Sequence, residues 1–195
     1  MDSFKVFLIE KGGVDQSAYK TIENEIATIE VKKGESLLKA GEVCHRFFFV
    51  QKGLLRTYSL NDQGEINILQ FSTEGWIAAD RGSYYFNLPS VYYIDAIEDT
   101  TAIVLDEKFT NLILEVAPVF SRFNEKLIQN HVRHLNKRIT SLLGDSAESR
   151  YLKFVELYPD VLLRVPQWMV ASYLGITPES LSRVRRALAK KNFGK

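Results

Sequence analysis

The chain has 195 residues, of which 46% are hydrophobic, and this is enough to bury the core of one large domain or two small ones. No apolar run reaches the roughly 18 residues that a membrane helix needs. No basic segment precedes an apolar stretch behind Met1, so we expect a cytoplasmic protein. The net charge of +1 hides an asymmetry: residues 163–195 hold seven Lys or Arg and one acid, Glu179, for a local charge of +6, which leaves −5 for residues 1–162.

The N-terminal part of the chain has the pattern of a β-domain that follows a short helix. Residues 15–25 predict that helix, with Asp15 as its N-cap. The single cysteine, Cys44, cannot form an internal disulfide, and we expect a buried structural thiol. Short β-branched and aromatic runs separated by glycine-containing turns predict an antiparallel barrel or sandwich, with strands over residues 27–31, 45–51, 54–60, 65–72, 76–79, 92–97 and 101–106.

The pattern after these strands is helical. Residues 107–116 predict a short helix, and residues 118–143 a long amphipathic one, suited to packing against its own copy in a dimer or against the body of the protein. Gly144 can end this helix and Asp145 can cap the next, over residues 146–158, so we place a domain boundary at Gly144. The apolar positions of the long helix, with His131 filling one gap, are Phe120, Phe123, Leu127, Leu135, Ile139 and Leu142.

Two short helices with a tight turn between them are predicted in residues 165–191. Gly175 can take the left-handed conformation that ends the first helix, and Thr177-Pro178 restarts a helix with a hydroxyl cap and a proline. Ala171 is small where the two helices must approach. This is the helix-turn-helix pattern, so we expect DNA as the partner of the basic C-terminal end. An ordinary helical hairpin with a basic face is the alternative.

The second of these helices carries side chains suited to a major groove. Arg183 can pair with guanine in bidentate fashion and Glu179 can accept from cytosine, while the basic residues beyond them can neutralise phosphates. We expect DNA contacts from Gln167, Thr177, Glu179, Ser180, Ser182, Arg183, Arg185, Arg186 and Lys190.

Nearly the whole chain resembles the Crp/Fnr family of transcription regulators, and most of all its Bacteroidetes-type subgroup. The resemblance is carried by the glycine-punctuated strands, the stretch Ile94–Asp99, the long helix and, most specifically, residues 171–183. It implies an α+β fold with three parts: a jelly-roll-type β-roll like that of cyclic-nucleotide-binding domains over residues 1–117, a dimerisation helix over 118–143, and a helix-turn-helix domain of the winged-helix type over 144–195.

The resemblance also assigns the residues that read DNA. The family uses a Glu and an Arg four residues apart on the second helix, and Glu179 and Arg183 hold those positions. Pro178 stands where the best-known members carry another Arg, so the preferred DNA sequence is expected to differ from theirs. Because little sequence follows the second helix, we expect a minimal form of the domain in which the hairpin wing is nearly absent.

At the effector site the sequence departs from the family. The family's cyclic-AMP pocket uses a Gly-Glu pair, whose Glu takes the ribose hydroxyl, and an Arg-Ser or Arg-Thr pair, whose Arg takes the phosphate. Residues 76–80 (WIAAD) and 88–91 (LPSV) occupy these places, and Arg81 would be a misplaced substitute. Burying a phosphate without a cation is costly, so we expect neither cyclic AMP bound in the usual way nor another cofactor.

Another effector remains open. The aromatic residues Tyr84, Tyr85, Phe86, Tyr92 and Tyr93 either line a pocket for an apolar or aromatic effector or fill the roll and support the long helix. For an unidentified small molecule in the roll we expect contacts from Phe71, Ile77, Ala78, Ala79, Asp80, Ser90, Val91 and Tyr92.

Two other classes of function compete with a DNA-binding regulator. His131 and His134 form an H-x-x-H pair, but no third ligand, phosphate loop or nucleophile–base set accompanies it, so we expect neither a metal site nor an enzyme. A ligand-binding roll with weak or lost DNA binding is the second class, and the Glu179–Arg183 pair argues against it. We therefore expect a homodimer on palindromic duplex DNA, with an unknown effector and RNA polymerase as further partners and no membrane association.

Overall fold

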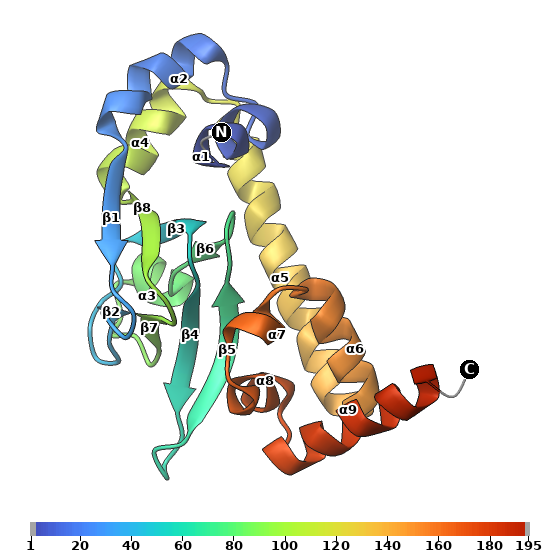
Figure 1. Cartoon of the computed structure of the whole chain (residues 1–195). Helices are drawn as coiled ribbons and strands as arrows, with labels where there is room; N and C mark the ends of the chain where they lie inside the picture. Colours follow the sequence, from blue (N-terminus) through green and yellow to red (C-terminus); the bar gives the residue numbers. More distant parts are fainter. Residues whose placement is uncertain (1–2, 194–195) are drawn as a thin grey trace. The chain divides into compact units, whose positions relative to one another are not determined.

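A β-rich N-terminal part is followed by helices in the computed structural model, which describes residues 3–193 (Figure 1). The chain divides into two compact units: unit 1 comprises Met1–Ser59 and Gln70–Asn130, and unit 2 comprises Leu60–Leu69 and His131–Lys195. Within the described residues, no helix combines the length and apolarity that crossing a bilayer would require. The domain boundaries expected from the sequence stay a prediction.

Two four-stranded sheets form the roll, which confirms the predicted fold class. β8 (Thr100–Leu105) pairs antiparallel with both β1 (Ala27–Val31) and β3 (Phe47–Lys52), and β6 (Ile77–Ala78) completes this sheet at the β3 edge. The second sheet has the order β2 (Ser36–Leu38), β7 (Tyr93–Ala96), β4 (Leu55–Leu60), β5 (Ile66–Ser72). The seven predicted strands are confirmed with small shifts at their ends, and β2 was not predicted.

Both faces of the sheet are buried where β3 and β8 run side by side, and apolar side chains accordingly follow one another in these two strands without alternation. Residues of both sheets, together with Cys44, form what we call the inner cluster: Val31, Leu38, Cys44, Phe48, Val50, Leu55, Ala78, Ile94, Ala96, Ala102 and Val104. Cys44 is buried as predicted, and its Sγ lies 3.2 Å from the carbonyl oxygen of Arg46.

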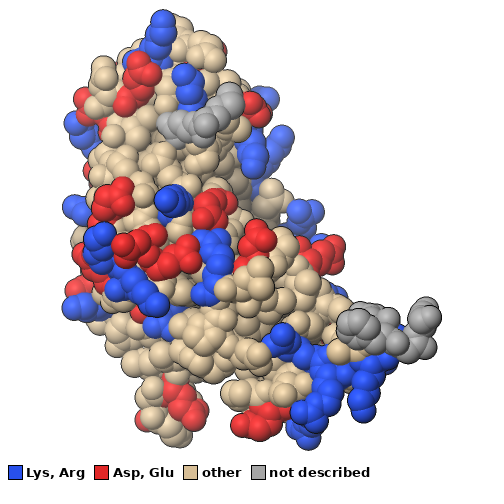
Figure 2. Space-filling model, viewed as in Figure 1, with Lys and Arg blue, Asp and Glu red and all other residues tan. Residues whose placement is uncertain are grey.

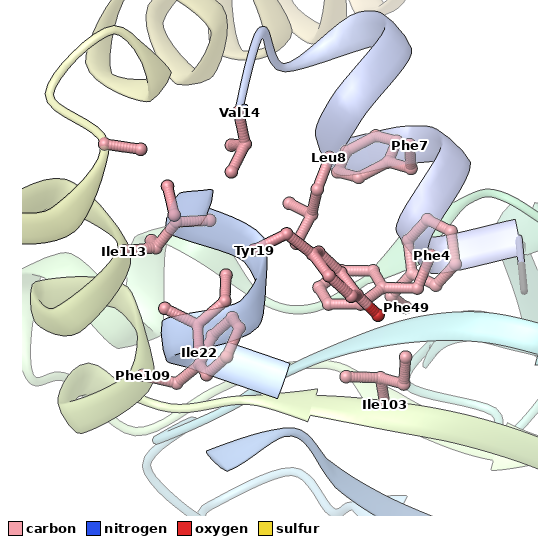
Figure 3. Packing of buried hydrophobic residues seen from close by; sticks show 12 residues of the cluster. Phe4, Phe7, Leu8, Val14, Tyr19, Ile22, Phe49, Ile103, Phe109 and Ile113 are labelled. Atoms are coloured by element: carbon pink, nitrogen blue, oxygen red, sulfur yellow. The ribbon is translucent and has the colours of Figure 1, made fainter. Parts of the chain in front are cut away.

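The opposite face of this sheet is covered by N-terminal helices and by α4 (Glu107–Val116). The residues that meet there, Phe49 and Ile103 from the strands with Phe4, Phe109 and others from the helices, form the outer cluster (Figure 3). The helices before β1 are α1 (Ser3–Val6), the π-helical turn η1 (Phe7–Lys11), α2 (Gln16–Ile22) and the 3₁₀ turn η2 (Glu23–Glu25).

The sequence predicted α2 and α4 but not α1 or η1. Asp15 is the N-cap of α2 as predicted and accepts from the Ala18 N–H at 2.8 Å.

Gly53 lies at the most crowded turn of the roll. Its φ is +102°, and a Cβ there would stand 2.7 Å from Thr100 Cα and 2.8 Å from the carbonyl oxygen of Asp99. We expect Gly53→Ala to lower the free energy of unfolding by about 2–3 kcal/mol. The alanine would have a strained φ, and the backbone atoms of Asp99 and Thr100 would also have to move away from its Cβ. Urea unfolding checks this against Gly64→Ala, where φ is +77° with nothing within 4 Å. Equal losses in the two variants would contradict the steric part of the argument.

Unit 2 contains most of the C-terminal helices. The helix α3 (Arg81–Phe86) belongs to unit 1. The helices that follow α4 are α5 (Phe120–Gly144), α6 (Ala147–Leu157), α7 (Val161–Arg164), α8 (Gln167–Leu174) and α9 (Pro178–Phe193). The prediction that Asp145 caps α6 is wrong. Ser146 is the N-cap and accepts from the Ser149 N–H at 3.1 Å, while Asp145 forms an ion pair with Lys153 at 2.6 Å.

The long helix α5 has two apolar faces rather than the one stripe expected. Phe120, Phe123 and Leu127 pack against the outer cluster and belong to unit 1. Beyond residue 130 a different face is apolar and exposed; its residues, which we call the seam, are Val132 (45% exposed), Leu135 (42%), Ile139 (55%) and Leu142 (40%). Packing on the body, one of the two alternatives for this helix, therefore holds for its first half. Packing of the second half against its own copy in a dimer stays a prediction.

Candidate nucleic-acid interface

The turn between α8 and α9 is fixed by its own backbone and one hydroxyl. Gly175 has φ +64°, its N–H donates to the carbonyl of Ser172 at 3.0 Å, and the Ile176 N–H donates to the carbonyl of Ala171 at 3.1 Å. These two bonds form a Schellman motif, which ends α8 and satisfies its last carbonyls. Thr177 Oγ1 then accepts from the Ser180 N–H at 3.2 Å and caps α9, so the predicted stop and restart are confirmed.

The faces that α6, α8 and α9 turn toward one another are buried. Ala171 of α8 and Leu181 of α9 are each 1% exposed, so the small side chain of Ala171 does lie in the buried face of α8. The aromatic rings of Phe154, Tyr158 and Tyr173 pack against one another, with centroid distances of 5.2–5.5 Å. This packing leaves the opposite side of α9 open.

That open side of α9 carries the predicted reading residues. Glu179, Ser182, Arg183 and Arg186 are exposed, and Ser182 and Arg183 each lie three or four positions from both Glu179 and Arg186, so the four share one face of the helix. The backbone N–H of Glu179 and the Thr177 hydroxyl hold the pKa of the Glu179 carboxyl below its ordinary value, with a smaller contribution from Arg183. Glu179 is therefore an ionised acceptor at neutral pH.

Arg183 is oriented from within its own helix. Its Nη2 donates to Ser180 Oγ at 3.0 Å, and no carboxylate pairs with it among the described residues. A guanidinium held by a neutral hydroxyl keeps its remaining donors for a ligand.

Further cations extend this surface along α9. Arg185, Arg186 and Lys190 are exposed, whereas Lys191 donates to Glu148 of α6 at 2.7 Å. Figure 2 shows the blue Lys and Arg side chains gathered over α9, at the lower right. Gln167, at the first position of α8, is also exposed. Lys195 and the expected wing region after residue 193 lie outside the described residues.

A second set of contacts in unit 2, between α8 and strand β5, was not predicted from the sequence. Ser172 Oγ donates to the carbonyl of Ile66 at 2.7 Å and accepts from the Ile68 N–H at 3.0 Å. Arg138 of α5 donates to the carbonyls of Leu69, of Ile68 at 2.9 Å and of Tyr173 at 3.0 Å. We call Arg138, Ser172 and the backbone of residues 66–69 the β5 clamp.

In the part of the chain that the structure describes, no carboxylate pairs with the buried charge of Arg138. Burial lowers the pKa of the Arg138 guanidinium from its ordinary value, but three carbonyl dipoles and the Tyr173 ring, whose centroid lies 4.0 Å from Arg138 Cζ, face the charge. A mid-helix Arg was not a distinctive signal in the sequence, and only the fold brings it to β5.

The eight residues expected around an effector in the roll lie in different environments. Phe71 and Ala78 are fully buried and Val91 is exposed, while Ile77 packs against the outer cluster. Ala79 is half-buried beside the inner cluster, and Tyr92 is half-buried. That these eight form one effector site stays a prediction.

Asp80 and Ser90 lie in the two stretches that, by the family resemblance, correspond to the cyclic-AMP pocket. Asp80 Oδ2 accepts from the Ser90 hydroxyl at 2.8 Å, and Asp80 Oδ1 accepts from the Ser83 N–H at 3.1 Å, which caps α3. Arg81 instead lies over the Phe47 ring, 5.0 Å from its centroid. A phosphate placed beside Ser90 would meet a carboxylate, so these residues do not fit the group.

Among residues 3–193, no cluster of three or more His, Cys, Asp or Glu side chains is placed to hold a metal ion. Burial lowers the pKa of His134, and the charges of Arg138 and Lys137 lower it further. The H-x-x-H pair therefore lies in a cationic neighbourhood.

Comparison with known proteins agrees with this architecture. Residues 28–115 match the family of the cyclic nucleotide-binding domain. The chain is 23% identical over 168 residues to electron transport regulator A of Shewanella oneidensis, which covers 79% of this chain and 65% of that protein. The chain spans 62–65% of the length of the first curated relatives it matches.

Solved structures show the same fold over most of the chain. A CooA mutant from Carboxydothermus hydrogenoformans superposes with a TM-score of 0.73 at 22% identity, covering 94% of this chain and 84% of that one. A protein described as a Crp/Fnr family regulator, from Eubacterium rectale, has a TM-score of 0.66 at 19% identity, with coverage of 92% and 85%. The chain therefore shares the fold of these solved structures, and residues 28–115 match the cyclic nucleotide-binding domain.

Proposed function

We propose that the chain is a transcription regulator that binds specific duplex DNA through α9. The observation that carries this proposal is the outward face of α9, where Glu179 and Arg183 stand four residues apart beside exposed cations. Glu179 is ionised, and Arg183 has no carboxylate partner within residues 3–193. Such a helix can place donors and acceptors at base edges while its cations contact phosphates. Binding rather than catalysis is the activity we propose, and the Bacteroidetes-type subgroup and a cytoplasmic location stay predictions.

We propose further that the regulator is a homodimer joined along the seam. Val132, Leu135, Ile139 and Leu142 follow a 3-4-3 spacing, which is the a/d spacing of a coiled coil. β-branched residues stand at both a positions and Leu at both d positions, a distribution that favours two parallel strands. A two-fold dimer would present two copies of α9 to half-sites of a palindrome about one helical turn apart.

The effector is proposed to be something other than cyclic AMP bound in the usual way, because Asp80 and Ser90 leave a carboxylate where the phosphate would lie. A signal in the roll would act by favouring one of two arrangements of α5 and the helices after it. Such a ligand must bind one arrangement more tightly than the other to have any effect. RNA polymerase is a further proposed partner.

The main proposal is tested by selecting bound duplexes from a random DNA pool and then titrating the protein into the DNA site that is most enriched. We expect Arg183→Ala to weaken that site by about 1–3 kcal/mol and to relax the preference at one base pair of each half-site. The reason is that a bidentate contact to one base is lost while the phosphate contacts remain. The measurement is fluorescence anisotropy with the selected site and its single-base variants.

Arg185→Ala is the matched control, because it removes the same charge from the same helix two residues away. We expect it to weaken all duplexes alike and to reduce the slope of log K against log salt by about one. Unchanged base preference in Arg183→Ala would show that this residue does not read a base. Absence of any salt-dependent duplex binding by the wild type would leave a ligand-binding roll as the function.

A further inference from the structure

A pocket opens on the outer face of the roll, on the other side of the sheet from the inner cluster. Its interior volume is about 50 Å³, and its mouth is open to solvent. Its lining comes from α1, η1, β3, β6, α3, β8, α4 and α5, all within unit 1. We call it the outer pocket; its lining residues are mostly apolar, many are aromatic, and the polar ones that matter here are Arg81, Tyr85 and Asn124.

Arg81 is the only charged residue among the described residues that line the outer pocket. Its guanidinium lies 5.0 Å from the centroid of the Phe47 ring. Among residues 3–193, no carboxylate pairs with it and no side-chain hydrogen bond holds it, in contrast to Arg56, which is tied to Asp95 at 2.7 Å. Burial lowers the pKa of the Arg81 guanidinium from its ordinary value.

A half-buried cation in an apolar pocket is costly until an anion joins it. A single guanidinium matches a single carboxylate in charge and in bidentate geometry. A phosphate monoester would bring nearly two charges, and the described residues that line the pocket include no second cation to compensate them. The aromatic and aliphatic walls suit an apolar body attached to that carboxylate.

We propose that the outer pocket binds an amphipathic carboxylic acid, with its carboxylate on Arg81 and its apolar chain between the ring of Phe47 and the α5 wall. Phe120, Asn124 and Leu127 supply that wall, and the same helix continues into the seam. A bound acid would therefore contact the helix that carries the proposed dimer interface. Binding of the acid does not depend on the DNA-binding proposal; only its consequence for DNA does.

Three probes of equal chain length test the chemistry: octanoate, octanol and octylamine, each titrated into the full-length protein by calorimetry. We expect wild type to bind octanoate at least tenfold more tightly than octanol, and to bind octylamine weakest. Arg81→Gln should bring the affinity for octanoate down to that for octanol. Arg46→Gln is the matched control, because Arg46 is exposed, belongs to the same unit and does not line the pocket; it should keep the preference.

A second variant tests the pocket without changing Arg81, so that the proposal stays testable if Arg81→Gln does not fold. Asn124→Phe narrows the pocket from α5 and should weaken octanoate and octanol together, while thermal unfolding shows that the protein is folded. Equal binding of octanoate and octanol by wild type, or an unchanged octanoate preference in Arg81→Gln, would overturn the proposal. Octanoate binding that requires Arg81 in a protein that binds no duplex would uphold the pocket and refute the DNA-binding function alone.

Discussion

Replacing Ile139 by Lys is expected to dissociate the proposed dimer and, with it, to abolish tight binding to a palindromic site. Ile139 is 55% exposed in the single chain and stands at an a position of the seam. Burying the exposed half of this side chain contributes about 1–1.5 kcal/mol, and a two-fold interface loses it twice, or about 2–3 kcal/mol. Two lysines facing each other add repulsion, so the dimer dissociation constant should rise by about two to four orders of magnitude.

Analytical ultracentrifugation over a wide concentration range measures this effect directly. Thr140→Lys is the matched control, because it adds the same charge one residue away at an exposed position outside the seam. The control should leave both the dimer and duplex affinity in place. A monomeric wild type, or a dimer that survives Ile139→Lys, would show that the seam is covered by something other than a second copy of α5.

The roll and the recognition helices could be predicted because their signals are local. Strand periodicity, turn glycines and the Gly175–Thr177 stop and restart each act over a few residues, and they place β1 and α4 with the observed bounds. The N-cap of α6 was predicted wrongly. Ser146, not Asp145, caps this helix, because Asp145 forms an ion pair with Lys153. Two adjacent cap formers cannot be ranked without knowing their tertiary partners.

The features that were missed depend on contacts between distant segments. The apolar positions of α5 formed one list in the sequence, but the fold covers Phe120 and Phe123 and leaves Leu135 and Ile139 open. Arg81, considered only as a misplaced phosphate ligand, turned out to line a pocket on the other face of the sheet. The hairpin of residues 60–69 belongs with the C-terminal helices, which no local pattern indicated.

Removal of the Arg138 side chain is expected to cause the largest loss of stability in unit 2. Arg138→Ala leaves the carbonyls of Ile68, Leu69 and Tyr173 without their donor. Each buried acceptor that loses its partner costs about 1–3 kcal/mol, and water will reach some of them, so we expect about 3–5 kcal/mol in total. Urea unfolding at constant protein concentration measures the loss, and Arg133→Ala, an exposed Arg on the same helix, should cost less than about 0.5 kcal/mol.

The same change should loosen a specific piece of backbone rather than the whole unit. Ser172 alone would then hold the edge of β5, through the Ile68 N–H and the Ile66 carbonyl. Hydrogen exchange of the Ile68 amide should therefore accelerate modestly in Arg138→Ala, and by much more when Ser172→Ala is added, because the two side chains hold one short strand segment and their effects couple. If the double variant lost only the sum of the single losses, Arg138 and Ser172 would stabilise separate parts of unit 2. The clamp would then not be a cooperative link between α8 and β5.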